Sequence, residues 1–220
     1  MTGKRGIAKT REVEGKTQVY MQLKSGESII LQTFTRSLQG EPEWKYRKEM
    51  DYSLSLDHGW KLRFVESYPA IEGEFKIDTP SSWTEIAHPA AKINRGTALY
   101  SLELDLPELS ADDWVLDLGD VRESARVRIN GQEAGIAWAA PFRLSIGQLL
   151  KSGKNLIEVE VTNLPANSIA EMDRQGKQWR IFEDINMAKL NYEKGTYGHW
   201  ETLPSGLNGI VRLIPVKYLF

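Results

Sequence analysis

The dipeptide Asn130-Gly131 predicts a tight β-hairpin near the middle of this chain. A type I′ turn requires positive φ at both central residues, and Asn-Gly tolerates this conformation better than most pairs. The residues from Asp117 to Ile129 read as a strand, a short corner and a second strand, and the turn leads into a third. The turn and the flanking pattern agree on one register, so antiparallel β structure is expected here.

Alternation of apolar and polar residues recurs along the chain. From Tyr100 to Leu106 every second residue is apolar, and the residues between them are polar. Residues 60–65 and 155–162 follow the same pattern, with Ile157, Val159 and Val161 facing inward. Such alternation places one side of each strand in a core and the other in water. Many short strands with little helical periodicity predict an all-β, antiparallel β-sandwich with little helix.

Three segments depart from this pattern. Residues 1–16 are polar and are expected to be a loosely held lead-in. Residues 19–23 and 28–34 are expected to pair as strands around a turn at residues 24–27. Residues 164–207 contain no clear strand, so we expect a long loop insertion with a short helix near residues 184–190.

The composition excludes several classes of function. The chain has 28 Lys and Arg against 30 Asp and Glu, and no segment is basic enough to predict a nucleic-acid partner. No apolar run approaches the roughly 20 residues that span a bilayer, so no membrane contact is predicted. The absence of cysteine excludes disulfides and thiolate metal sites. The three histidines are far apart in sequence, so no metal site is predicted from them.

The hairpin and its surroundings resemble a known domain. Asn130-Gly131, followed by Gly135 and Pro141-Phe142, is similar to the sugar-binding jelly roll that accompanies family 2 glycoside hydrolases. Leu56-Asp-His-Gly-Trp60 and Leu203-Pro-Ser-Gly-Leu207 resemble the start and the end of the C-terminal module in rhamnosidase-type glycoside hydrolases of family 106. The resemblance runs from about residue 56 to residue 216.

The resemblance implies a galactose-binding-like jelly roll attached to a glycoside hydrolase. Residues 55–220 would form this sandwich, and residues 1–54 would be either the tail of a preceding β domain or extra strands of the sandwich. The parent enzyme would be periplasmic or secreted, although the first residues of the chain contain no apolar signal segment. The resemblance also suggests a structural calcium, which jelly rolls of this class sometimes hold through carbonyl oxygens and a carboxylate, but carbonyl ligands leave no trace in a sequence. No other cofactor is predicted.

No catalytic activity is expected from this chain. The resemblance implies that the catalytic carboxylates lie on a separate barrel, and the sequence lacks the βαβ alternation that a barrel requires. Glycoside hydrolysis needs two carboxylates at a defined separation. Asp117 with Asp120, or Glu183 with Asp184, can be nominated only because they are close in sequence.

Aromatic residues in loops are the candidates for sugar binding. A pyranose ring needs an exposed aromatic face, with hydrogen-bonding groups beside it. Trp138 follows the hairpin among small residues, and the long loop supplies Trp179, Tyr197, His199 and Trp200. The loop residues equally fit a hydrophobic cluster that holds the loop, and Trp138 equally fits a tryptophan that caps the end of the sandwich. Arg180, near Trp179, could bond sugar hydroxyls or lie on a solvated charged face.

Two functions follow. In the first, the chain is a carbohydrate-binding accessory module of a polysaccharide-degrading glycoside hydrolase, with a weak groove near Trp138 and residues 176–200. In the second, the sandwich packs on the catalytic barrel of the parent protein and supports it without binding sugar. The second function predicts a large exposed apolar patch. A standalone adhesin or receptor domain is a third interpretation.

Overall fold

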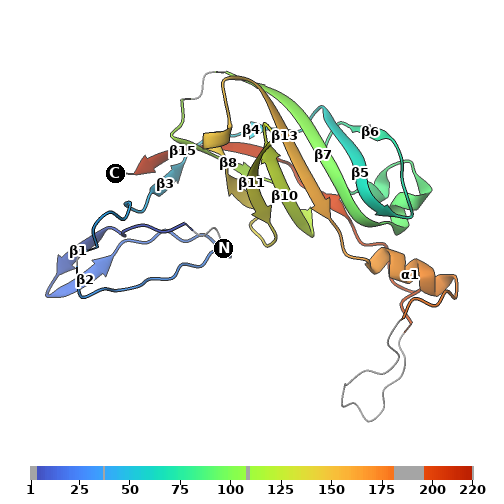
Figure 1. The fold of residues 1–220 in the computed structure, drawn as a ribbon, viewed down its shortest axis with the longest axis horizontal. Coiled ribbons are helices and arrows are strands. Elements are labelled where there is room, and N and C mark those ends of the chain that lie inside the picture. The colour runs from blue at the N-terminus through green and yellow to red at the C-terminus, as the bar shows by residue number, and fades with distance from the viewer. Residues whose placement is uncertain (1–3, 37, 108–109, 181–195, 220) are drawn as a thin grey trace, which may run out of the picture.

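The computed structural model describes residues 4–36, 38–107, 110–180 and 196–219. In these residues the chain forms two antiparallel β-sheets packed face to face (Figure 1). All pairings between the named strands are antiparallel. The predicted all-β antiparallel sandwich is therefore confirmed.

The larger sheet has six strands in the order β11-β10-β13-β7-β5-β6. Their bounds are β5 Trp60–Tyr68, β6 Glu74–Ile77, β7 Arg95–Leu106, β10 Ser124–Ile129, β11 Gln132–Ala137 and β13 Gly153–Thr162. The predicted hairpin joins β10 to β11, with Ile129 opposite Gln132. Asn130 has a φ of 53° and Gly131 a φ of 79°, so both central residues adopt the positive φ that the sequence predicts.

The second sheet has five strands, in the order β12-β8-β15-β3 with β4 also paired to β15. Their bounds are β3 Tyr46–Glu49, β4 Leu54–Ser55, β8 Asp113–Asp117, β12 Arg143–Ser145 and β15 Arg212–Leu219. β3 precedes residue 55 in sequence and pairs with β15. The domain boundary at residue 55 stays a prediction, but residues 46–49 belong to the sheet. β9 (Val121–Arg122) pairs separately with β14 (Gly206–Leu207).

One core lies between the two sheets. Tyr100 and Leu102 of β7 and Val159 of β13 face Leu116 and Leu213 of the smaller sheet, and all of them are buried. Ile157 and Val161 are also buried, as the alternation predicts. The inward-facing side chains come from both sheets, so each sheet buries its apolar face against the other.

Helices are short in the described residues. Three 3-10 helices occur, η1 (Trp83–Glu85), η2 (Pro89–Ile93) and η3 (Gly147–Leu149). The α-helix α1 (Ala166–Arg174) lies where the sequence predicts only a loop. Its buried residues are Asn167, Ser168 and Ala170, so its buried face is small and mostly polar, unlike the apolar stripe by which a helix is usually recognised in a sequence. The helix expected near residues 184–190 lies outside the described residues. No helix in the described ranges is long and apolar enough to cross a membrane.

The N-terminal residues differ from the prediction. Their strands are β1 (Thr10–Val13) and β2 (Lys16–Val19), which form a hairpin that stands away from the sandwich (Figure 1). Residues 10–13 therefore are not part of a loose lead-in. Residues 20–34, here called the N-terminal arm, contain no strand. The alternation in the arm resembles that of a half-buried strand, but the arm has no core to face, and Ile30 is 86% exposed.

Side chains attach the start of the N-terminal arm to the outer edge of β3. The Gln22 side chain donates to the Arg47 carbonyl at 3.0 Å and accepts from the Arg47 amide at 2.8 Å. The Tyr46 hydroxyl donates to the Tyr20 carbonyl at 2.8 Å. The two Gln22 contacts satisfy backbone groups of Arg47 at the edge of a sheet, which would otherwise be open to pairing with another chain.

Candidate functional site

The outer face of the six-stranded sheet carries two adjoining depressions at the end where β13 leads into α1. Their volumes are about 260 and 420 Å³, and they share Glu66. The first is lined by Val65, Glu66, Thr97, Ser124, Arg126, Ile136, Glu160 and Thr162. The second is lined by Glu66, Ser67, Tyr68, Arg95, Gly96, Asn163 and Pro165. We call the two together the sheet trough.

Strand register brings the floor of the sheet trough together. Ser124 lies opposite Thr162, and Thr162 lies opposite Thr97. In the next row, Glu160 lies between Leu99 and Arg126, and Arg126 lies opposite Ile136. Because the intervening residues of these strands are buried in the core, alternation turns both rows outward. The Thr97 and Thr162 hydroxyl oxygens are 2.8 Å apart.

A glycine shapes the wall of the trough between β5 and β7. The register of these strands shifts between Phe64 and Glu66, which is the geometry of a β-bulge. Gly96 lies opposite the shifted segment with a φ of 147°, and a Cβ atom on it would lie 2.0 Å from the Glu66 carbonyl oxygen. Only glycine permits this approach. The bulge leaves both Val65 and Glu66 exposed.

The charges in the trough are unevenly paired. Glu160 lies opposite Arg126 in the register, but its carboxylate bonds the Arg128 guanidinium at 2.6 Å instead. This hydrogen bond raises the pKa of Arg128. In the described part of the chain, neither the Arg126 side chain nor the Glu66 side chain has a hydrogen bond or an ion pair. The trough therefore offers the Arg126 guanidinium and the Glu66 carboxylate to a ligand, and Arg95 adds a second guanidinium in the depression that contains Glu66.

Two exposed aromatic side chains occur at or just beyond the ends of strands that line the trough, and one of them, Tyr68, belongs to its lining. Trp138 is 65% exposed and follows Ile136 by two residues at the open end of β11. Tyr68, at the end of β5, is 54% exposed, and the Arg95 guanidinium lies 4.4 Å from the centre of its ring. Aromatic faces beside hydroxyls and charged groups are suited to a ligand that is apolar on one side and polar at its edges.

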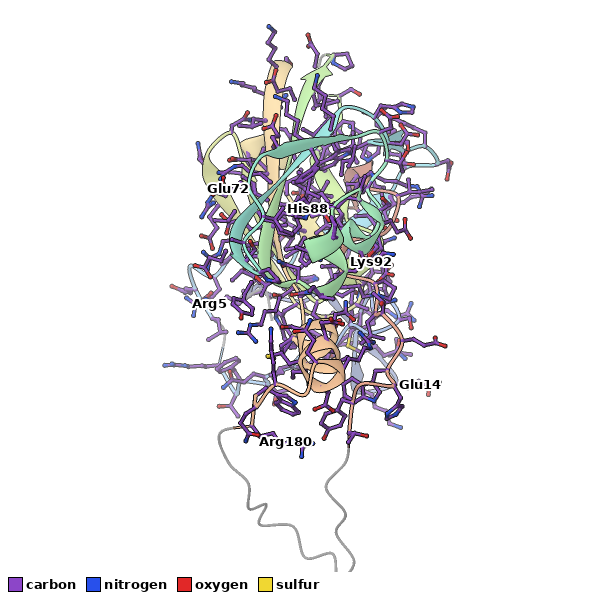
Figure 2. All side chains as sticks on the ribbon, turned by 90° about the vertical axis from the view of Figure 1, so that its right-hand side faces the viewer. Arg5, Glu14, Glu72, His88, Lys92 and Arg180 are labelled. Carbon is purple, nitrogen blue, oxygen red and sulfur yellow. The ribbon has the colours of Figure 1, made fainter. Side chains whose placement is uncertain are left out.

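Three of the five predicted site residues, Trp179, Tyr197 and Trp200, lie together outside the sheet trough. The Tyr197 ring centre is 5.6 Å from that of Trp179 and 4.6 Å from that of Trp200. The Arg180 guanidinium lies 4.9 Å from the Trp179 ring centre, and Figure 2 shows Arg180 beyond the end of α1. These residues form what we call the loop cluster. His199 is exposed next to Trp200.

The end of α1 organises the loop cluster. The Asp173 carboxylate accepts hydrogen bonds from Trp179 Nε1 at 2.7 Å and from the Tyr197 amide, and these bonds lower the pKa of Asp173. Arg174 donates to the carbonyls of Gly198 and Trp200, both at 2.8 Å. Rings that stack on one another leave less surface for a ligand. The arrangement fits a cluster that pins the chain, and its role in sugar binding stays a prediction.

The segment that follows Trp138 lies against the N-terminal arm. The turn at residues 24–27 of the N-terminal arm lies against the segment that follows Trp138, because a Cβ on Gly26 would be 3.0 Å from the Ala140 carbonyl oxygen. Lys24 in this turn pairs with Glu49, which also pairs with Arg143 at 3.2 Å. The arm and the charges of the smaller sheet therefore support the loop that carries Trp138.

The carboxylates nominated by sequence proximity have other partners. Asp117 pairs with Arg143 at 2.6 Å, and Asp120 pairs with Arg122 at 2.8 Å. Glu183 and Asp184 lie outside the described residues. Within the described ranges, no three His, Asp or Glu side chains are grouped as metal ligands.

None of the residues that line the sheet trough, Arg126, Glu160 and Tyr68 included, was among the predicted site residues. The alternation in β13 indicates that Glu160 faces outward, but a single strand does not reveal which residues lie beside it. Only the register across β10, β13 and β7 brings these residues together.

Comparison with known proteins relates the chain to glycoside hydrolases. No protein-family model matches it. A candidate β-glucuronidase of Formosa agariphila is 29% identical over 197 residues, which are 81% of this chain and 17% of that protein. The structure of a rhamnosidase from Novosphingobium sp. PP1Y has a TM-score of 0.67 and 24% identity, and the match covers 96% of this chain and 19% of the rhamnosidase.

A third similarity is to the β-glucuronidase of Bifidobacterium dentium, with a TM-score of 0.53, 18% identity, and coverage of 77% of this chain and 31% of that enzyme. The chain matches a segment of glycoside-hydrolase-type proteins. It spans less than a third of each of these three relatives. The structural similarities establish a shared sandwich fold, and the rhamnosidase match extends over nearly the whole chain, most of the N-terminal residues included.

Proposed function

We propose that this chain is a non-catalytic, carbohydrate-binding accessory module of a polysaccharide-degrading glycoside hydrolase, and that sugar binds in the sheet trough. The observation that carries the proposal is the exposed indole of Trp138, which follows β11 directly beyond the trough residue Ile136. An indole face packs against the apolar face of a pyranose ring, and this contact requires the ring to be accessible.

The polar residues of the trough suit the rest of the ligand. Sugar hydroxyls donate and accept hydrogen bonds, and the trough presents the hydroxyls of Ser124, Thr97 and Thr162 beside Arg126 and Glu66. The trough lies on the outer face of the sheet, so part of a bound sugar stays in water. Binding is therefore expected to be weak, in the micromolar to millimolar range.

Trp138→Ala is expected to lower the affinity for oligosaccharides by about tenfold or more, because it removes the aromatic platform. Isothermal titration calorimetry with a panel of plant oligosaccharides, rhamnose-bearing ones included, measures the effect. Trp200→Ala is the matched control, because it removes an indole from the loop cluster. Loss of binding in Trp200→Ala alone would move the site to the loop cluster. No binding of any sugar by the unmodified chain at millimolar concentration would contradict the proposal.

A second candidate function is structural support of the parent hydrolase, and the N-terminal arm favours it. Six large apolar side chains of the arm are exposed: Tyr20, Met21, Leu23, Ile30, Leu31 and Phe34. Apolar residues concentrated in one exposed segment indicate a contact surface. The proposed partner is the catalytic barrel of the parent protein.

The double substitution Ile30→Asp and Phe34→Asp tests this second function. Both side chains are exposed, so the thermal unfolding midpoint is expected to change by no more than about 2 °C. Association with the remainder of the parent hydrolase, expressed as a separate polypeptide, is expected to be lost in a co-purification experiment. Retention of the complex by the double variant would contradict docking through the arm.

A further inference from the structure

Arg126 lies opposite a glutamate, Glu160, that forms its ion pair with a different arginine. The register places Glu160 opposite Arg126, and opposite charges on facing strands ordinarily pair. The Glu160 carboxylate instead bonds Arg128 at 2.6 Å. Glu158 and Glu133 also act on Arg128, where they raise its pKa together with Glu160. The acidic residues of this face therefore gather around Arg128 and leave the Arg126 guanidinium available on the trough surface.

The unpaired carboxylate of the trough is too far away to neutralise Arg126. Glu66 belongs to β5 and Arg126 to β10, and β13 and β7 lie between them. Three inter-strand spacings of about 4.8 Å separate their backbones by roughly 14 Å. The trough therefore has a cationic end at Arg126 and Ile136, a centre of threonine hydroxyls, and a far end where the carboxylate of Glu66 and the guanidinium of Arg95 both occur.

We infer that the sheet trough selects sugars that carry an anionic group, and that Arg126 binds this group. The inference rests on the proposed function, because it assigns a ligand class to the same site. A guanidinium offers a planar pair of N–H donors that match a carboxylate or a sulfate ester. Trp138, two residues beyond Ile136 in the chain, would hold the ring that carries the anionic group.

The span of the trough sets the direction of the bound chain. A distance of roughly 14 Å exceeds the length of a single sugar ring, so an oligosaccharide lies across the strands. Its acidic unit lies at the Arg126 end, and its neutral units extend over Thr162 and Thr97 toward Glu66.

The test compares ligands that differ only in charge. Calorimetric affinities are measured for a uronic-acid-bearing oligosaccharide, for the same oligosaccharide with its carboxyl group reduced to an alcohol, and for a sulfated oligosaccharide. The unmodified chain is expected to bind an anionic ligand about tenfold more tightly than the neutral one. A preference for the uronic acid or for the sulfated ligand identifies which anionic group is bound. Raising the salt concentration is expected to weaken the preference, because the contact is exposed.

Arg126→Gln is expected to remove this preference. The affinity for the anionic ligand falls about tenfold, and the affinity for the neutral ligand stays within about twofold. The control is Arg212→Gln, which removes an exposed arginine from β15 in the other sheet and so changes the net charge equally. Unchanged preference in Arg126→Gln, or an equal loss for the anionic and the neutral ligand, overturns the inference.

The same experiment separates the inference from the proposed function. Equal binding of the anionic and the neutral ligand by the unmodified chain, with loss of both in Trp138→Ala, overturns the inference and supports the carbohydrate-binding function. Binding of neither ligand at millimolar concentration overturns both.

Discussion

Gly96→Ala is expected to destabilise the chain by roughly 2–5 kcal/mol, since it combines backbone strain with a steric clash. The φ of Gly96 is 147°, and the added Cβ would lie 2.0 Å from the Glu66 carbonyl oxygen. The obstacle is the backbone of a neighbouring strand, so it cannot move without breaking the pairing of β5 with β7. Urea unfolding followed by circular dichroism measures the change. The same substitution should also lower sugar affinity, because it displaces Glu66.

Gly153→Ala is the matched control. Gly153 also has a positive φ, 82°, but nothing lies within 4 Å of an added Cβ. Its cost is therefore limited to the conformational term of about 1–2 kcal/mol. A loss of stability in Gly96→Ala no larger than that in Gly153→Ala would show that β5 and β7 are not packed as closely as described.

Trp60→Ala is expected to destabilise the sandwich by about 3–5 kcal/mol. The Trp60 side chain is 1% exposed, and its Nε1 donates to the Leu56 carbonyl at 2.7 Å. The substitution leaves a large cavity between the sheets and deprives a buried carbonyl of its donor. Chemical unfolding monitored by far-UV circular dichroism measures the loss.

The control for Trp60→Ala is Trp138→Ala, which removes the same side chain from an exposed position. Its effect on stability is expected to be within about 0.5 kcal/mol, as for most surface substitutions. The two tryptophan variants thus separate stability from binding: Trp60→Ala should unfold readily, and Trp138→Ala should stay folded and lose sugar. An equal loss of stability in both variants would contradict the exposed position of Trp138.

The predictions from sequence succeeded where the signal is local. The Asn130-Gly131 turn depends on the φ preferences of two residues, and it forms as predicted. The inward faces of β7 and β13 follow from alternation in each strand, and their residues are buried. These features require no knowledge of what lies across the core.

The predictions failed for two segments in which the apolar and polar pattern of the sequence does not match the local structure. The sequence of the N-terminal arm alternates like that of a strand. The arm contacts β3 through the Gln22 side chain, however, and not through a ladder of backbone hydrogen bonds. α1 is a helix with a small, polar buried face, and Asn167 holds it through two hydrogen bonds of 2.8 Å to the backbone of Leu203. In both cases the deciding partner is distant in sequence.

The sequence by itself determined the hairpin, the inward face of its strongest strands and the sandwich class, because each depends on residues close together in the chain. The tertiary structure alone decided the sheet trough. Arg126 and Glu160 are neighbours because β10 pairs with β13, and Glu66 joins them because Gly96 lets β5 approach β7. Strand order and register arise from packing across the whole sandwich. For that reason the sequence alone identifies Trp138 as a candidate for sugar binding, whereas only the fold identifies the charged residues of the trough.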